Sequence, residues 1–400
     1  MPSPAALPRL TVLTPSMDRH TLPIAVQIRM AEGEHQIATL TVLTPLARDR
    51  RALDANVPAS LVLPEGTPVK FAWGSSLADT SIWYGYVSSR QVQSTKAQIA
   101  NPQAPVVPVV YTLTGISRPM QSARSRAYTG VSASAAARSV IADYGLAAYV
   151  QPHPRIWPAL AQGSLSDFAW LTQLAEKIGY RLNADVDRIT FADAGTDLTP
   201  TSITPPTFSR ALQSGIWDSL IEFDPASGQS DPSGSTVAAI TSYAVRPSSG
   251  TAAAVNLAPG IVGADGTTGA PTFSKIACGS AQSYADAADN AAAEAAGSRY
   301  WVYANATVDG SSTLRPGRTV VLGGDGVTAA DQGRWRISCA THALTLSSLG
   351  QATATYYAYL DLGRDQYADL DVTAPTPPLD RAGAMSLVSG SWISPGTAAP

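Results

Sequence analysis

The chain repeats one pattern of turns and strands at a fixed distance. Residues 64–83 read PEGTPVKFAWGSSLADTSIW, and residues 316–335 read PGRTVVLGGDGVTAADQGRW. The two stretches lie 252 residues apart and are identical, without a gap, at seven positions, from Pro64 and Pro316 to Trp83 and Trp335. Proline and glycine are typical of a tight turn, and the β-branched runs that follow are typical of strands. The repeat predicts one β-structure built twice; two unrelated hairpins with similar turns are the alternative.

The N-terminal part of the chain predicts strands and no helix. Six runs rich in Val, Thr, Leu and Ile end at proline or glycine, which favours short strands. These runs are residues 9–15, 22–30, 37–45, 68–73, 82–90 and 106–115. We therefore expect a small barrel or sandwich over residues 1–128, completed by about residues 200–223.

Residues 129–199 predict a compact α/β insert. Residues 132–145 form helix-type sequence after a serine cap candidate. In residues 164–180, Ser164 and Asp167 fit a capping box, apolar residues recur at helical spacing, and Gly179 fits a left-handed stop. A hairpin around Asp185–Asp187 is expected to follow.

Residues 224–372 predict the second barrel. Its strand candidates are residues 237–245, 300–308, 319–322, 335–344 and 352–362, with an Ala-rich helix at 281–296 and a long loop at 246–272. A further strand candidate, residues 216–223, precedes it in the part expected to complete the first barrel. In the strand from Trp335, alternation places Trp335, Ile337 and Cys339 on one face. Residues 373–400 are rich in Pro, Gly, Ala and Ser and predict a tail that orders only against a partner. The fold class is therefore mainly β, with two similar tube-type barrels and a small helix–hairpin domain.

The composition of the chain argues against several classes of binding partner. Charged residues make up 14% of the chain and the net charge is −3, so no strong field favours nucleic acid or an anionic membrane. Cys278 and Cys339 are far apart and fit small apolar core residues better than a metal site. The first ten residues lack the apolar stretch of a signal peptide, and no apolar run reaches the length of a membrane span.

The ordered set of motifs resembles a known family. SDFAWLTQLAEKIGYRL followed by DRITFAD is similar to the signature of phage tail hub proteins, which include late control protein D-like baseplate hubs and the N-terminal part of type VI secretion spike proteins. LRPGRTVVLGG, RWRISCATHAL and YLDLGRD resemble that family's second barrel, and GTPVKFAWG with IWYGYV resembles its first. The resemblance spans residues 9–365.

The resemblance implies a structural, non-enzymatic protein of a virion tail tip, made in the host cytoplasm. It implies a homotrimer whose six barrels form a pseudo-hexameric ring, with a tail tube or distal tail protein ring above and a tip, spike or central fibre protein below. DNA would pass without specific binding, and a tape measure protein is a further candidate for the lumen. The alternatives are a tail-tip cell-wall hydrolase or carbohydrate-binding module, and the hub of a phage-like contractile injection or secretion system.

Residues with catalytic or ligating chemistry do not form a recognisable set in the sequence. His20, His35, His153 and His342 are isolated and lack metal-type spacing. Asp167 and Glu176 are nine residues apart, and Asp167 fits a helix cap better than a catalytic acid. Trp157 fits a hydrophobic plug against the helix that carries Trp170, with a sugar platform as the alternative, and GGDG at 323–326 fits a turn. We therefore expect no catalytic residue, no cofactor and no metal ion.

Overall fold

The structure is a computed structural model that is mainly β, with large antiparallel sheets and, among the described residues, the α-helices α2 (Ala133–Ala142) and α3 (Asp167–Lys177). It describes residues 8–14, 22–45, 47–48, 55–56, 63–92, 106–210, 219–227, 239–245, 253–256, 273–275, 302–329, 331–346 and 354–364. The predicted helix at 281–296 and the predicted tail at 373–400 lie outside these residues. No helix in the described ranges is long and apolar enough to cross a membrane.

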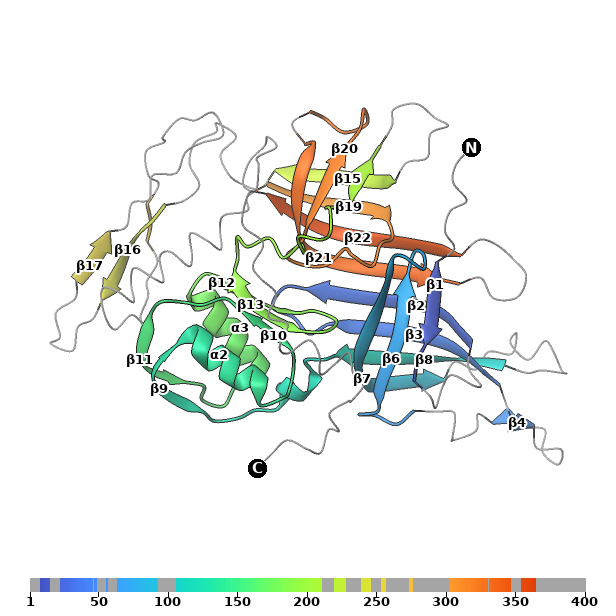
Figure 1. Ribbon diagram of the computed structural model, residues 1–400, viewed down its shortest axis with the longest axis horizontal. Helices are drawn as coiled ribbons and strands as arrows, with labels where there is room; N and C mark the ends of the chain where they lie inside the picture. The colour runs from blue at the N-terminus through green and yellow to red at the C-terminus, as the bar shows by residue number, and fades with distance from the viewer. Residues whose placement is uncertain are drawn as a thin grey trace.

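One sheet of twelve strands runs through the molecule (Figure 1). Its N-terminal half contains β1 (Arg9–Val12), β2 (Leu22–Ala31), β3 (Ile37–Pro45), β6 (Pro68–Gly74), β7 (Thr80–Val92) and β8 (Val106–Gly115). Their hydrogen-bonded order is β1-β6-β7-β8-β3-β2. Alternate residues face one core, where Trp73, Trp83 and Tyr111 are fully buried.

The C-terminal half of the sheet has the same strand order. It contains β14 (Thr207–Ser209), β15 (Leu220–Ser227), β19 (Val302–Asp309), β20 (Thr319–Gly323), β21 (Gly333–Thr345) and β22 (Thr355–Arg364). These strands pair in the order β14-β20-β21-β22-β19-β15, around a second core that holds Trp335. The strand β2 pairs with β21 and joins the halves into one sheet.

Two β-bulges recur at matching places in the two halves. The β2–β3 ladder shifts between Pro23 and Ala25, and the β15–β19 ladder shifts between Leu220 and Glu222. The β7–β8 ladder shifts after Val87, and the β21–β22 ladder shifts after Ile337. Because bulges are specific features of a ladder, their recurrence supports the predicted duplication.

The ladders also correct the ungapped alignment of the repeat. Gly66 N–H donates to Val87 O, and Gly317 N–H donates to Ile337 O, so these glycines are equivalent, with φ of 79° and 82°. The equivalent residues lie 251 positions apart in the turn and 250 in the strand, not 252. Trp83 and Trp335 therefore occupy the same face of their strands but not the same rung, because the loops after β6 and β20 differ in length.

The two halves differ in the strand that covers them. β1 runs antiparallel to β6, whereas β14 runs parallel to β20. Neither half closes into a barrel in the described residues: the strand order runs open from β1 to β15, and β20 with β14 branches from β21. The prediction of two barrels is therefore not confirmed, and two halves of one sheet stand in their place.

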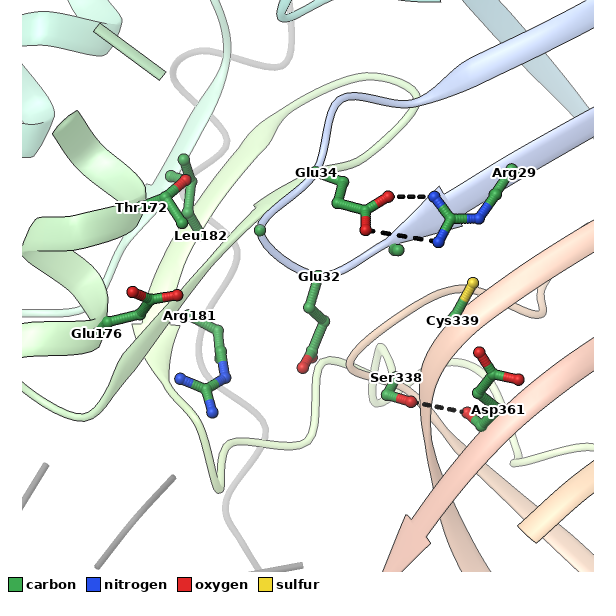
Figure 2. A pocket seen from close by; sticks show the side chains of 12 residues that line it. Arg29, Glu32, Glu34, Thr172, Glu176, Arg181, Leu182, Ser338, Cys339 and Asp361 are labelled. Carbon is green, nitrogen blue, oxygen red and sulfur yellow. Dashed lines mark hydrogen bonds and ion pairs between the residues drawn. The ribbon is translucent and has the colours of Figure 1, made fainter. Parts of the chain in front are cut away.

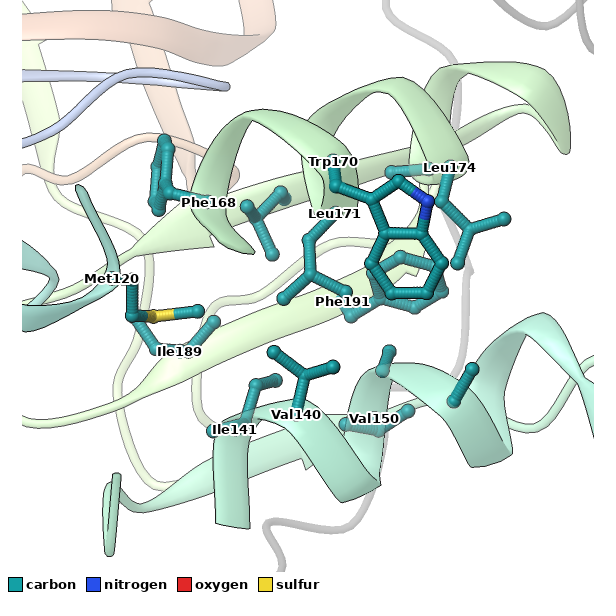
Figure 3. Close-up of a cluster of buried hydrophobic side chains, with 14 of the residues drawn as sticks. Met120, Val140, Ile141, Val150, Phe168, Trp170, Leu171, Leu174, Ile189 and Phe191 are labelled. Carbon is teal, nitrogen blue, oxygen red and sulfur yellow. The ribbon is translucent and has the colours of Figure 1, made fainter. Parts of the chain in front are cut away.

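Residues 118–193 lie beside the sheet and have their own core. This region contains η3 (Arg118–Gln121), β9 (Ala127–Ser132), α2 (Ala133–Ala142), β10 (Ala148–Val150), β11 (Ile156–Ala161), α3 (Asp167–Lys177), β12 (Tyr180–Ala184) and β13 (Ile189–Asp193). Figure 3 shows side chains of α2 and α3 converging on Ile189 and Phe191 of β13. The two predicted helices and the predicted hairpin are present, and the division of the chain into domains stays a prediction.

Three details of the sequence-based predictions were wrong. The cap of α3 is Ser166, whose hydroxyl accepts from Ala169 N–H, and not Ser164. The bulge after Ile337 turns Cys339 away from the face of Trp335, so that it pairs with Ala31 and Asp361. Residues 253–256 of the predicted loop 246–272 form β17, which pairs with β16 (Ala239–Val245) beside β18 (Phe273–Lys275). The remaining small sheet is β4 (Ala47–Arg48) with β5 (Ala55–Asn56).

Candidate functional site

Within the twelve-strand sheet, one series of eight strands ends in two edges that have no partner strand in the described residues. Eight strands form the continuous series β7-β8-β3-β2-β21-β22-β19-β15 (Figure 1). At one end, β15 pairs with β19 alone. At the other end, β7 pairs with β6 only as far as Tyr86, so from Ser88 to Val92 its second edge is open. Open edges expose backbone donors and acceptors to another strand.

The pairing of β2 with β21, which we call the internal joint, buries side chains that the two open edges leave more exposed. Where β2 meets β21, Val26, Ile28 and Met30 are buried, and so are Ala340, His342 and Leu344 of β21. On the open edges, Phe223 of β15 is only half-buried, Pro225 is exposed, and Val92 of β7 is 44% exposed. The open edges thus resemble the two sides of the internal joint with the partner removed.

The eight-strand series has one face that is covered only in part, by the residue 118–193 region, and we call it the open face. It is the face opposite the two cores, and threonines recur along it at Thr39, Thr41, Thr112, Thr307 and Thr341. Tyr303, Tyr357 and Tyr359 are exposed on it.

The charges of the open face are mostly acidic. In the described strands its arginines are Arg29, Arg334 and Arg336. Arg29 is ion-paired with Glu34, and Arg336 is ion-paired with Glu32. Glu222, Asp224, Asp309 and Asp361 lie on the same face. A polyanion would meet no unpaired arginine row there.

The two halves are also fixed to each other by contacts away from the ladder. Asp79 accepts hydrogen bonds from the N–H and the hydroxyl of Ser312, at 3.0 and 2.6 Å from Oδ1. Leu77, at the apex of the same loop, is 75% exposed. The loop of residues 75–79 in the first half is thus held against the second half.

A charged cluster joins both halves to the residue 118–193 region. Arg315 Nη1 lies 3.0 Å from Asp185 Oδ1, and Arg315 Nη2 donates to Ser81 Oγ at 2.5 Å. Arg318 Nη2 lies 3.7 Å from Asp185 Oδ2. Burial alone would raise the pKa of Asp185, but the two guanidiniums outweigh burial and lower it. This cluster was not found from the sequence, because Arg315 is 130 positions from Asp185 and 234 positions from Ser81.

A cavity of about 410 Å³ lies where the β2–β3 turn, α3 and β21 meet (Figure 2). Glu32, Glu34, Glu176, Arg181 and Cys339 are among its lining residues. Burial, followed by the nearby charge of Asp361, raises the pKa of the Cys339 thiol. A thiol held protonated is a poor nucleophile.

The histidines considered from the sequence are held separately in the fold. His342 is buried between Leu314 O and the Tyr356 hydroxyl, as expected for a core or interface histidine. His35 stacks on Phe168, and His153 lies edge-on to Tyr180. His20 and Cys278 lie outside the described residues. In the described ranges, no group of three or more His, Cys, Asp or Glu side chains could hold a metal ion.

Asp167 and Trp157 both have structural surroundings. The buried Asp167 carboxylate accepts from Arg126, from the Tyr144 hydroxyl and from Gln162 Nε2 at 2.6 Å. Burial and the hydrogen bond to Asp167 raise the pKa of Tyr144 to about 12. Arg155 and Lys177 lie over the Trp157 ring, at 4.0 and 4.3 Å from its centroid, and the ring is 4% exposed. A covered ring cannot stack on a sugar, which leaves the predicted plug as its role.

The sequence itself matches no protein-family model and no curated protein. The fold, however, is shared with solved structures along nearly the whole chain. A tail protein from Neisseria meningitidis MC58 has a TM-score of 0.56 and 12% identity, with 90% of this chain and 97% of that chain covered. A 43 kDa tail protein of prophage MuSo2 from Shewanella oneidensis has a TM-score of 0.54 and 10% identity, with 92% and 99% covered.

A third similar structure comes from a secretion machine. The E. coli c3393 protein, a component of the type VI secretion system with structural similarity to the T4 tail proteins gp27 and gp5, has a TM-score of 0.52 and 11% identity. The alignment covers 93% of this chain and 80% of that chain. The resemblance noted in the sequence is therefore confirmed at the level of the fold.

Proposed function

We propose that the chain is a structural hub protein of a phage tail tip that assembles as a homotrimer. The observation that carries the proposal is the duplication: two halves with one strand order and matching bulges, joined through one internal joint and ending in two open edges. Repetition of that joint between chains generates a ring rather than a dimer, because the two edges differ. Three chains then supply six similar half-sheets.

Such a ring presents nearly sixfold symmetry to a hexameric tail tube and threefold symmetry to a tip, spike or central fibre protein. The fold likeness to the Neisseria and Shewanella tail proteins supports this role. The open face would line the channel, and its paired arginines and its carboxylates suit the passage of DNA without retention. The role proposed is non-catalytic.

The oligomeric state tests the proposal directly. Native mass measurement over a wide concentration range, with and without a tail tube protein, is expected to show a species of three chains, and class averages from cryo-electron microscopy are expected to show a ring. A chain that stays monomeric at high concentration in the presence of the tube protein contradicts the proposal.

A second candidate is the hub of a phage-like contractile injection or secretion system. The fold likeness to the E. coli c3393 protein favours it. Both candidates require the same ring, and they differ in cargo. Packaging of DNA in particles purified with the chain supports a virion, whereas DNA-free particles that deliver protein support an injection system.

A further inference from the structure

The internal joint between β2 and β21 shows how two of these halves bind each other. The strands are antiparallel, with Arg29 opposite Thr341 and Ile28 opposite His342. Leu346 N–H donates to Ile24 O, and Glu32 N–H donates to Ser338 O. Even-numbered residues of β2 therefore direct their backbone groups toward β21, since these groups alternate along an antiparallel strand.

The open edge of β15 has the same alternation. Asp309 N–H donates to Ser219 O, whereas Gly310 N–H donates to Tyr356 O, so odd-numbered residues of β19 bind β15. Across from them, Glu222 and Asp224 bind β19. Phe223, Pro225 and Ser227 consequently direct their backbone groups to the open edge, as Val26, Ile28 and Met30 do at the internal joint.

The open edge of β7 completes the correspondence. Gly115 N–H donates to Gln36 O, so odd-numbered residues of β8 bind β3 and even-numbered residues bind β7. Ser89 lies opposite Thr112, and Gln91 lies opposite Val110. Arg90 and Val92 therefore direct their backbone groups outward, at the positions equivalent to Ala340 and His342 of β21.

We infer that β15 of one chain pairs antiparallel with the C-terminal half of β7 of the next chain, in the register of the internal joint. This inference rests on the proposed trimer and adds the residues that close it. Matching of the bulges places Ala226 opposite Gln91, Pro225 opposite Val92 and Ser227 opposite Arg90. The pairing would cover Phe223, Pro225 and Val92, whose counterparts at the internal joint are buried.

Pro225 makes the joint between chains weaker than the joint within a chain. It occupies the place of Ile28, where a backbone N–H would donate across the joint, and proline has none. The pair Pro225–Val92 keeps one hydrogen bond where Ile28–His342 can form two. A proline on an edge strand also discourages pairing with wrong strands before assembly.

A disulfide between chains tests the register. The Ala226–Gln91 pair corresponds to Arg29–Thr341, a pair without ladder hydrogen bonds, where Cα atoms approach to about 4.5 Å and a disulfide fits. The double variant A226C/Q91C, treated with an added oxidant, is expected to give covalent dimers and trimers on a non-reducing gel. The variant A226C/R90C is the matched control, because residue 90 faces the other side of its strand, and single-cysteine variants control for Cys278 and Cys339.

Mass measurement of the unoxidised variants separates the two levels of the proposal. Trimers that cross-link through 226/91 and not through 226/90 support the register. Trimers that do not cross-link, or cross-link equally through both pairs, overturn the register and leave the hub function intact. The absence of trimers overturns both.

Pro225→Ala provides an independent measurement. The variant restores a backbone donor, so each joint between chains gains one neutral hydrogen bond. We therefore expect the dissociation constant at each joint to fall by roughly two- to tenfold. The variant Pro158→Ala, in β11 of the residue 118–193 region, is the matched control and should leave the dissociation constant unchanged. An unchanged constant in Pro225→Ala contradicts the placement of Pro225 in the joint.

Discussion

Trp73 of the first half packs edge-on against His342 of the second half, with their ring centroids 4.5 Å apart. The His342 Nε2 atom lies 2.8 Å from Leu314 O, and Nδ1 lies 3.0 Å from the Tyr356 hydroxyl. A carbonyl can only accept, so Nε2 carries a proton. The lowered pKa of His342 leaves Nδ1 unprotonated at pH 7, so Nδ1 accepts from the Tyr356 hydroxyl. The imidazole is thus neutral, and burial lowers its pKa to about 3.

The first prediction concerns acid stability. An ordinary histidine pKa is 6.5, so between pH 6.5 and pH 3 the unfolded chain binds a proton at residue 342 that the folded chain excludes. The free energy of unfolding should therefore decrease as the pH is lowered through this window. His342 alone should account for roughly 2 kcal/mol of the decrease between pH 7 and pH 5. His35, whose pKa is also lowered by burial, adds a change of the same sign. Denaturant unfolding at several pH values measures the slope, and the variant His342→Gln should show a shallower one. An identical slope in the variant would contradict the assignment.

The second prediction concerns the Arg315 cluster. Replacement of Arg315 with alanine removes its contacts with Asp185 and Ser81 and leaves the carboxylate with Arg318 at 3.7 Å. Loss of one partner from a largely buried pair should lower the free energy of unfolding by about 3 kcal/mol. Arg29→Ala is the control, since Arg29 pairs with Glu34 at the surface, where the two side chains are 47% and 50% exposed, and it should cost less than about 1 kcal/mol. Equal losses in the two variants would show that Arg315 does not join the parts.

The same cluster gives the third prediction, at lower pH. The pKa of Asp185 is lowered, so its ionised form stabilises the fold above the ordinary carboxyl pKa of 3.8, and this stabilisation is lost as pH falls below that value. The variant Asp185→Asn should therefore be less stable than the native chain at pH 7, and the difference should shrink toward pH 2. Thermal unfolding at a series of acidic pH values provides the measurement. A difference that stays constant with pH would mean that the charge of Asp185 is not involved.

The fourth prediction concerns the cap of α3. The Ser166 hydroxyl accepts from Ala169 N–H, so Ser166→Ala should lower stability by about 1 kcal/mol. Ser164→Ala is the matched control and should have no measurable effect. Chemical denaturation of both variants distinguishes the structural cap from the one that the sequence suggested, and a larger effect at residue 164 would reverse the assignment.

The fifth prediction concerns Gly85 in β7. A Cβ atom there would lie 2.3 Å from Thr114 O and 2.3 Å from the Trp83 ring, so Gly85→Ala forces the tryptophan or the ladder to move. We expect a loss of about 1–3 kcal/mol. Gly323→Ala is the control, because a Cβ at that strand position meets nothing within 4 Å. Similar midpoints of unfolding for the two variants would contradict this account of Gly85.

Local chemistry predicted much of the fold from the sequence. The strands Ile37–Pro45 and Val106–Gly115 were predicted to the residue, because proline and glycine end them. Helix α2 and its Ser132 cap were predicted for the same kind of local reason. The duplication was recognised from turn residues, but the alignment was two residues out of register in the strand. Trp83 and Trp335 lie on the same face of their strands but at different positions along them, so their identity does not fix the register.

Features that depend on contacts between distant residues were not predicted. The bulge that turns Cys339 to the opposite face arises from the ladder with β22 and has no signature in the β21 sequence. Asp167 was interpreted as a cap, because its partners Arg126, Tyr144 and Gln162 come from other elements. The open edges of β7 and β15 likewise follow from the order of strands in the sheet, which the strand sequences do not specify.

Because β1 and β14 run in opposite directions on their partner strands, the inner and outer surfaces of the proposed ring differ in symmetry. Strands of the open face repeat in both halves of the chain, so a molecule in the channel meets nearly the same wall six times per turn. On the outside, β1 lies antiparallel on β6 and β14 lies parallel on β20, so that neighbouring halves present different surfaces. A protein that binds the exterior would therefore find three equivalent sites, and its stoichiometry would be set by the covering strands rather than by the channel.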